Sequence, residues 1–183
     1  MRPAHRPRRV RVVGTSGAGK TTLAARAGAR LGLPLLEVDA VVHREGWRTA
    51  TQKELDEALA AFLGSPAAAG GWVMDGNYWS RLSAVTDTAD TVVWLDYPRR
   101  LVMARLLRRT LGRVLTRRTL WNGNRERVRN LLRREPLDNI LVWAWTQHAG
   151  YRERYTALAA ADGERTWVRL RRPRDARRWL AGL

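Results

Sequence analysis

The 183-residue sequence contains no cysteine, one phenylalanine and two lysines, Lys20 and Lys53. The absence of cysteine excludes disulfide bonds, thiolate zinc ligands and a cysteine nucleophile. No run of eighteen apolar residues is present, which excludes a membrane-spanning apolar helix, and we expect no membrane partner. The first nine residues are basic and broken by two prolines, so they predict no secretory signal. We therefore expect a cytoplasmic protein.

The chain has the length of one ordinary domain, and 45% of its residues are hydrophobic, which is enough for a proper core. It shows no internal repeat and no low-complexity linker. We therefore predict a single domain over residues 1–183, with residues 1–8 as a flexible basic tail.

Acidic residues are scarce, because 34 lysines and arginines face 17 aspartates and glutamates and give a formal net charge of +17. This excess predicts attraction to polyanions such as nucleotides, nucleic acids or anionic membranes, and it does not choose among them. A chain-wide compositional bias, with most guanidinium groups simply solvated, explains many of the arginines equally well.

Short apolar runs alternate with helical patterns along the chain. This order predicts an α/β protein with a parallel sheet, because strands buried on both faces are continuously apolar. Thr51 and Glu54 have the spacing of a capping box and mark one helix start. We expect strands at 10–13, 35–39, 72–75, 91–96 and 166–170, and helices at 20–31, 51–63, from Pro98 onward with breaks near Gly112 and Gly123, at 138–161 and at 173–180.

Residues 14–21 read GTSGAGKT, which fits the phosphate-binding pattern G-x-x-x-x-G-K-[ST]. The pattern follows the first expected strand and opens the first expected helix, where backbone N–H groups and the helix start can surround phosphate oxygens. Lys20 would reach the β- and γ-phosphates of ATP, and the Thr21 hydroxyl would bind Mg²⁺. A lysine here, in a chain that otherwise uses arginine, fits the need for a compact ammonium group. The predicted nucleotide-binding residues are Gly14, Ser16, Gly17, Ala18, Gly19, Lys20, Thr21 and Thr22.

Three aspartates, Asp39, Asp75 and Asp96, are expected at strand ends. Ligands of open parallel sheets bind beyond the carboxyl ends of the strands, so one of these carboxylates should hold Mg²⁺ beside Thr21. Each aspartate taken alone could equally be a strand-end cap or a turn former.

Thirteen arginines and one acidic residue lie between Arg99 and Arg134. One interpretation is a mobile lid, at approximately 112–135, that closes over a triphosphate and brings guanidinium groups to the developing charge. The other interpretation is a nucleic-acid surface. Arg105 and Arg109 are four residues apart, so a helix would place both on one face.

Several segments together resemble the P-loop kinases of the adenylate kinase and shikimate/gluconate kinase type, and most closely an adenylate kinase-like branch called DNA topology modulation protein. The resemblance covers nearly the whole chain. It implies the three-layer P-loop NTPase fold, with a five-stranded parallel sheet of order 2-3-1-4-5. The matching segments are 14–21, LPLLEVDA at 33–40 followed by Gly46-Trp47, WVMDGNY at 72–78, ADTVVWLDYPRR at 89–100, and the helix that carries Arg105 and Arg109.

The resemblance also implies roles for individual residues. The implied strand order places the third strand beside the first strand, which leads into the phosphate-binding pattern. It therefore favours Asp75 over Asp96 as the Mg²⁺ carboxylate. Arg105 resembles the arginine near the adenine and triphosphate, and Arg109 resembles the arginine that touches the transferred phosphoryl group. The residues implied on the acceptor side are Asp39, Asn77, Tyr78 and Arg81, and Trp47 is a candidate for stacking on an acceptor ring.

The sequence differs from adenylate kinases at residues that would bind the acceptor. Adenylate kinases have a proline–arginine pair that helps to grip the acceptor phosphate where this sequence has Asn77-Tyr78, although Arg81 or Arg44 could compensate. The acceptor therefore stays open between a nucleotide and a small-molecule hydroxyl, for which Asp39 would be the general base. His43 and His148 have no readable partner, and we expect structural or solvated roles for both.

These observations predict a Mg·ATP-dependent phosphotransferase that moves the γ-phosphate to a small acceptor. The first alternative is a P-loop ATPase that binds nucleic acid through its arginine-rich surface. The second is a nucleotide-binding module without activity. The sequence does not reveal the acceptor, the donor base preference or the oligomeric state.

Overall fold

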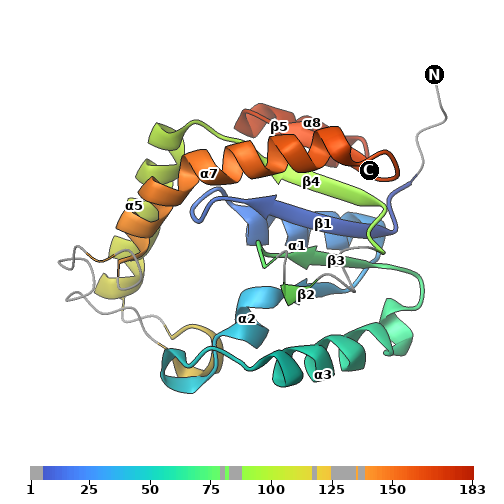
Figure 1. Cartoon of the computed structure of the whole chain (residues 1–183), viewed down its shortest axis with the longest axis horizontal. Coiled ribbons are helices and arrows are strands. Elements are labelled where there is room, and N and C mark those ends of the chain that lie inside the picture. The colour runs from blue at the N-terminus through green and yellow to red at the C-terminus, as the bar shows by residue number, and fades with distance from the viewer. Residues whose placement is uncertain (1–5, 79–80, 83–87, 117–118, 125–134, 136–138) are drawn as a thin grey trace.

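The fold is described from a computed structural model for residues 6–78, 81–82, 88–116, 119–124, 135 and 139–183. Within them, five strands form one parallel sheet with the order β2-β3-β1-β4-β5, which confirms the predicted α/β class and strand order (Figure 1). The strands are β1 (Arg9–Gly14), β2 (Leu35–Glu37), β3 (Trp72–Asp75), β4 (Thr91–Leu95) and β5 (Thr166–Leu170).

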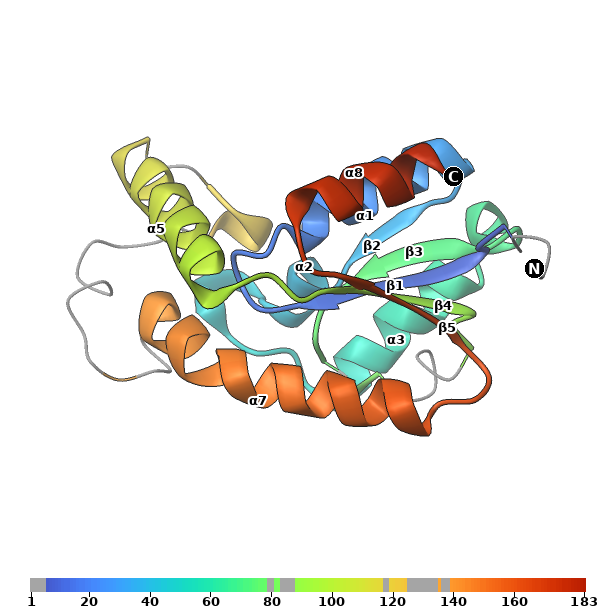
Figure 2. The same ribbon diagram turned by 90° about the horizontal axis from the view of Figure 1, so that it is seen from above.

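Helices cover both faces of the sheet (Figure 2). Val10 and Val12 of β1 pack in one cluster with residues of three helices, and Val13 packs on the opposite face against Tyr155. This alternation follows from the two-residue period of a strand and explains why the strands are apolar throughout. The first face carries α1 (Lys20–Leu31) and α8 (Pro173–Ala181), and the second carries α3 (Gln52–Leu63) and α7 (Ile140–Ala161).

Two further helices lie at the carboxyl ends of the strands, α2 (Val38–Val42) and α5 (Arg99–Leu115). Short 3₁₀ turns occupy Glu45–Trp47 (η1), Pro66–Ala68 (η2) and Trp121–Gly123 (η4). In the described residues, no helix has both the length and the apolar character needed to cross a membrane.

The predicted start of α3 is confirmed by its side-chain cap. The Thr51 side chain accepts a hydrogen bond from the N–H of Glu54, and the Glu54 side chain accepts one from the N–H of Thr51. The two bonds complete the capping box of α3. Asn139 caps α7 by accepting from the first N–H groups of the helix. The expected start of that helix at residue 138 lies outside the described residues.

Several predicted boundaries were wrong. The second strand ends at Glu37 rather than at Asp39, because Val38 and Val42, four residues apart, bury one face of α2 against α3. Asp39 therefore lies in the first turn of a helix. The fourth strand ends at Leu95, and α5 continues through Gly112 to Leu115 without a break.

The predicted tail and lid are described only in part. The backbone of Arg8 accepts from the N–H of Trp72 and donates to the Asp90 carboxylate, so the chain is held at the sheet from this residue onward. Residues 1–5 lie outside the described part. Within the predicted lid the structure describes the end of α5 and residues 119–124, whereas 117–118 and 125–134 lie outside it.

Candidate functional site

The loop between β1 and α1 wraps closely against neighbouring backbone. Gly14 and Gly17 have φ values of 143° and 87°, which favour glycine. A Cβ atom on Gly17 would lie 2.8 Å from Cβ of Leu106 and 2.9 Å from the carbonyl oxygen of Val102. The loop is therefore fitted against α5, and only a residue without a side chain fits there.

The start of α1 lacks the usual side-chain partners. Its N-cap residue is Gly19, which forms no side-chain hydrogen bond, and the first turn contains no acidic residue. The first N–H groups of a helix have no partner within the helix, and the helix dipole adds positive potential there. This arrangement suits an anion at the mouth of the loop.

Lys20 lies among charged groups at this helix start. Its ammonium group is 3.5 Å from the carbonyl oxygen of Thr15. Burial lowers the pKa of Lys20, nearby Asp39 and Asp75 raise it, and Arg109 lowers it further. One ammonium, two carboxylates and one guanidinium group, which come from four different elements, are thus close enough to interact.

Thr21 and Asp75 form an oxygen pair beside Lys20. The Thr21 hydroxyl donates to the Asp75 carboxylate over 2.5 Å. Burial raises the pKa of Asp75 to about 6, although the Thr21 hydrogen bond and Lys20 act in the opposite direction. Hydroxyl and carboxylate oxygens are the ligands that Mg²⁺ prefers in proteins, so these two residues fit the predicted magnesium site.

Asn77 lines the cleft and also binds the backbone at the end of β1. Its amide accepts from the N–H of Gly14 over 3.1 Å and donates to the carbonyl oxygen of Gly14 over 2.9 Å. The Tyr155 hydroxyl donates to the same amide oxygen over 3.1 Å. The amide group of Asn77 therefore joins the end of β1 to α7, a role that the sequence did not reveal.

Arg105 and Arg109 lie on one face of α5, next to the loop. Arg105 donates to the carbonyl oxygen of Ala18 over 3.3 Å, and its guanidinium group lies over the Tyr97 ring, 5.2 Å from its centre. Arg109 is one turn further along and is close enough to Lys20 to affect its pKa. Both guanidinium groups thus flank the loop that carries the phosphate-binding pattern.

Asp39 belongs to a chain of polar contacts on the other side of Lys20. The Tyr78 hydroxyl lies 3.0 Å from Oδ1 of Asp39 and 3.2 Å from Nε2 of His43. A carboxylate only accepts, so the hydroxyl proton points to Asp39 and Nε2 of His43 donates to the hydroxyl oxygen. Burial and the Asp39 charge both raise the pKa of Tyr78, so Tyr78 remains a donor.

The turn at 121–124, which belongs to the predicted lid, lies beside these polar contacts. Trp121 donates from Nε1 to Glu37 over 2.9 Å, and the Asn122 amide donates to the carbonyl oxygen of His43 over 2.6 Å. Asn124 accepts from the N–H of Trp47 over 2.9 Å. The turn at 121–124 therefore contacts the segment 37–47, about eighty residues earlier in the chain.

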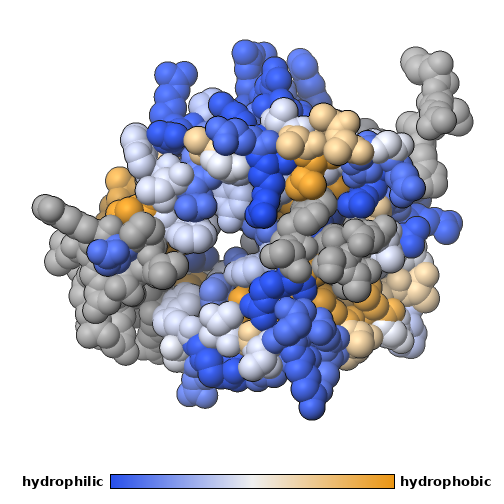
Figure 3. Space-filling view, viewed as in Figure 1, coloured by the Kyte–Doolittle hydropathy of each residue, from blue (hydrophilic) through white to orange (hydrophobic). Residues whose placement is uncertain are grey.

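Most of these groups line one cleft of about 1960 Å³ at the carboxyl ends of the strands, where the surface is hollowed (Figure 3). Pockets for single ligands usually measure about 300–1,000 Å³, so the cleft has room for two. Trp143 and Tyr151 of α7 also line it. Of the predicted site residues, those that line the cleft are Ser16, Gly17, Ala18, Gly19, Lys20, Thr21, Thr22, Asp39, Trp47, Asn77, Tyr78, Arg105 and Arg109.

Arg81 does not line the cleft. It donates to the carbonyl oxygen of Ala50 over 2.6 Å and to the side chain of Gln52, which places it beside the start of α3. Asp75 and Gly14, at the ends of β3 and β1, are buried and do not line the cleft either.

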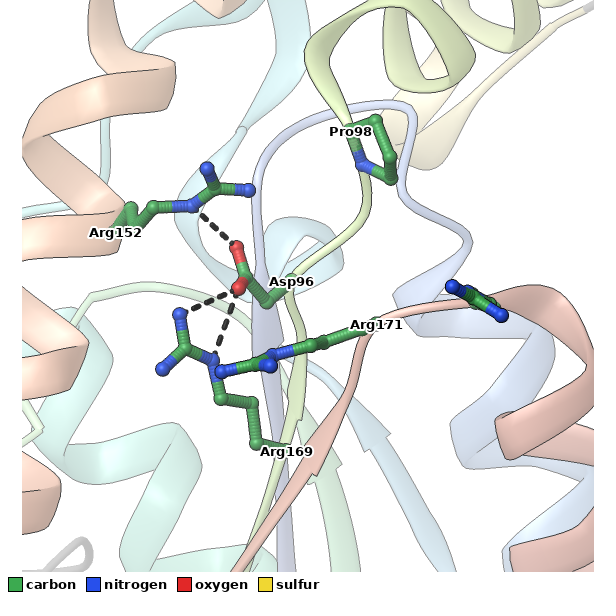
Figure 4. Close-up of a pocket in the computed structure, with 6 residues that line it drawn as sticks. Asp96, Pro98, Arg152, Arg169 and Arg171 are labelled. Atoms are coloured by element: carbon green, nitrogen blue, oxygen red, sulfur yellow. Dashed lines mark hydrogen bonds and ion pairs between the residues drawn. The ribbon is translucent and has the colours of Figure 1, made fainter.

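Asp96 has a different environment from Asp75. Arg152 reaches it over 2.8 Å and Arg169 over 2.7 Å, in a smaller pocket of about 380 Å³ (Figure 4). The Arg169 guanidinium also stacks over Trp94, 4.2 Å from the ring centre. Asp96 thus ties α7 and β5 to the end of β4, and it is Asp75 that lies beside Thr21.

Sequence reasoning missed several residues of the site. His43 was expected to be structural or solvated, yet it contacts Tyr78, and Glu37 and Trp121 were not singled out. No local signal could reveal these contacts, because they join segments 35 to 84 residues apart. His148 agrees with the expectation, since it is buried and bonds to the carbonyl oxygen of Tyr97.

The sheet order and the helices on both faces define the P-loop NTPase-like kinase fold. Among solved structures, the chain is similar to a sugar kinase from Janibacter sp. HTCC2649 in its unliganded form, with a TM-score of 0.50 and 18% sequence identity. The match covers 95% of this chain and 92% of that chain. At this identity the likeness concerns the fold alone. No protein-family model and no curated protein match the sequence.

Proposed function

We propose that the protein is a phosphotransferase that moves the γ-phosphoryl group of Mg·ATP to a small acceptor beside Asp39. The observation that carries this proposal is the start of α1, where the N-cap residue Gly19 forms no side-chain hydrogen bond and the first turn contains no acidic residue, and which carries Lys20 and the Thr21–Asp75 pair. N–H groups, an ammonium group and a hydroxyl–carboxylate pair in this order are the groups that a magnesium-bound triphosphate needs.

In this proposal each group has one task. The N–H groups of residues 16–22 and the Lys20 ammonium bind the β- and γ-phosphates. Thr21 and Asp75 hold Mg²⁺, which neutralises charge on the phosphate oxygens when it is bound. Arg105 and Arg109 stabilise the charge that develops on the transferred group, because guanidinium groups beside the loop require no reorganisation during the reaction.

The other half of the cleft would hold the acceptor. Asp39 lies close enough to Lys20 to affect its pKa, so an acceptor bound to Asp39 would lie next to the terminal phosphate. The likeness of the fold to a sugar kinase supports a kinase activity. The size of the cleft, with room for two ligands, supports a reaction between two bound molecules.

The test is a measurement of ADP release with purified protein, Mg·ATP and a panel of nucleotides and hydroxyl compounds. We expect release that depends on an acceptor, and we expect Asp39→Asn to lower kcat by on the order of 10²–10⁴ if the acceptor group is a hydroxyl. Asp56→Asn, on the exposed side of α3, is the matched control and should leave kcat unchanged.

Two results would count against this proposal. ATP hydrolysis that needs no acceptor, together with steeply salt-dependent binding of DNA or RNA, would support a nucleic-acid ATPase instead. Tight Mg·ATP binding without any turnover would support a binding module.

A further inference from the structure

The smaller pocket, of about 380 Å³, is separate from the cleft, and no described residue lines both cavities (Figure 4). Its charged lining consists of four arginines and one aspartate, so it carries an excess of three positive charges. Guanidinium groups gathered at one place repel each other unless an anion lies among them. The lining residues are Asp96, Pro98, Arg152, Arg169, Arg171 and Arg172.

The carboxylate of this pocket is already bonded on both oxygens. Asp96 is 7% exposed, and its Oδ1 accepts from Nε of Arg152 over 2.8 Å. Its Oδ2 accepts from Nε and Nη2 of Arg169 over 2.9 and 2.7 Å, and the Arg169 guanidinium is held further by the Trp94 ring. Asp96 thus orients two guanidinium groups and compensates the charge of one.

The two oriented guanidinium groups keep donors for a ligand. In the part of the chain that the structure describes, Nη1 and Nη2 of Arg152 and Nη1 of Arg169 form no hydrogen bond. The two side chains are 46% and 33% exposed. A molecule in the pocket can therefore reach N–H groups whose positions are set by Asp96 and, for Arg169, by Trp94.

Arg171 adds a cation to the pocket without a partner for its own charge. Its guanidinium group forms no hydrogen bond or ion pair with any described residue. Asp175, four residues further on, accepts from the backbone N–H groups of Arg171 and Arg172 instead. The Arg171 side chain extends toward Arg169 (Figure 4). A guanidinium group that extends toward another one favours an anion at that point.

We propose that this pocket is an anion site outside the cleft, which binds the phosphate group of a small molecule, or inorganic phosphate, through Arg152, Arg169 and Arg171. Guanidinium groups match the paired oxygens of a phosphate, and a phosphate dianion offsets the excess charge better than a carboxylate does. The volume of the pocket lies in the range of small-ligand sites. The site does not rest on the proposed function, because no residue of the cleft takes part in it.

The test is calorimetric titration of inorganic phosphate, pyrophosphate and glucose 6-phosphate at fixed ionic strength into Lys20→Ala, a background chosen to weaken binding at the loop before α1. We expect one site per chain. Adding Arg171→Gln should weaken binding at least about tenfold, because a charged hydrogen bond is lost. Arg178→Gln is the matched control, since it removes the same charge from an exposed arginine of α8 that lines neither cavity, and it should leave the Kd unchanged. Equal affinity for phosphate and glucose 6-phosphate would show that the phosphate group alone is recognised, whereas tighter binding of the sugar phosphate would show a site for a phosphorylated molecule.

Two results would overturn this inference. One is that Lys20→Ala binds none of the three anions. The other is that Arg171→Gln leaves their affinity unchanged or weakens it no more than Arg178→Gln does. Equal weakening by the two variants, together with steeply salt-dependent binding of DNA, would show that these arginines act as a diffuse nucleic-acid surface. A failure of the proposed function would appear separately, as absent binding of Mg·ATP to the wild type.

Discussion

The Thr21 hydroxyl donates to the Asp75 carboxylate over 2.5 Å, so the first turn of α1 is joined to the end of β3. Asp75 is only 3% exposed, and burial raises its pKa to about 6. A carboxylate that is buried with one hydroxyl donor beside a single ammonium group is costly to ionise without a further cation. The pair is thus a structural link, and the cost of ionising Asp75 agrees with the magnesium site that we propose there.

Asp75→Asn is expected to stabilise the ligand-free protein at neutral pH. Because the pKa of Asp75 is raised in the folded state, folded protein binds the proton more tightly than unfolded protein, and stability falls as the pH rises from about 4 to about 6. The amide removes this cost, so the free energy of unfolding at pH 7.5 should rise by on the order of 1–3 kcal/mol. Guanidinium titrations at pH 4.5 and 7.5 measure the difference, which should shrink at the lower pH. A less stable variant at pH 7.5 would show that the charged hydrogen bond outweighs the cost of burial.

Gly17→Ala is expected to destabilise the fold by about 1–3 kcal/mol. The new Cβ would meet Leu106 and the Val102 carbonyl at under 3.0 Å, and the φ of 87° disfavours any side chain. Gly112→Ala is the matched control, since Gly112 lies within α5 with no neighbouring atom within 4 Å. That change should stabilise the protein by about 0.5–1 kcal/mol. Equal effects of the two substitutions in thermal unfolding would contradict the close fit of the loop against α5.

Glu54→Gln is expected to reduce the loss of unfolding free energy that occurs as the pH falls into the acid range. The Arg48 guanidinium and the Thr51 N–H and hydroxyl hold the pKa of Glu54 well below its usual value. Its stabilising effect is therefore present above about pH 4.5 and is lost as the pH falls toward the lowered pKa. Urea titrations between pH 6 and pH 3 should show a smaller loss for the variant than for the wild type. Glu57→Gln, an exposed change on the same helix, should keep the wild-type slope, and an unchanged slope for Glu54→Gln would refute the prediction.

The sheet could be predicted from sequence because its signals are local. Apolar runs predicted the positions of the strands, and the phosphate-binding pattern predicted the junction between the first strand and the first helix. Thr51 with Glu54 predicted the start of α3. The second strand was predicted two residues too long, because Val38 and Val42 also fit an apolar strand end. Only their contact with α3, more than ten residues further on, makes that segment helical.

The acceptor half of the cleft could not be predicted in the same way. Contacts such as Trp121 with Glu37 join residues 84 positions apart, and no periodicity reveals them. The position of Asp75 and Asp96 at strand ends did not distinguish them, and only the family resemblance favoured Asp75. The different environment of Asp96 comes from Arg152 and Arg169, which reach it from elements 56 and 73 residues away. The composition, rich in arginine throughout, could not indicate which guanidinium groups pair with which carboxylates.

The most direct test of the account is calorimetric titration of Mg·ATP into the wild type, Lys20→Ala and Lys53→Ala. Lys53 is the only other lysine and lies exposed on α3, paired with Glu57 at 4.0 Å. We predict that the wild type and Lys53→Ala bind Mg·ATP equally well. Lys20→Ala should bind about 10- to 100-fold more weakly, because a charged hydrogen bond to the phosphates is lost. Equal binding by Lys20→Ala, or no binding by the wild type, would contradict the claim that the loop before α1 holds a triphosphate.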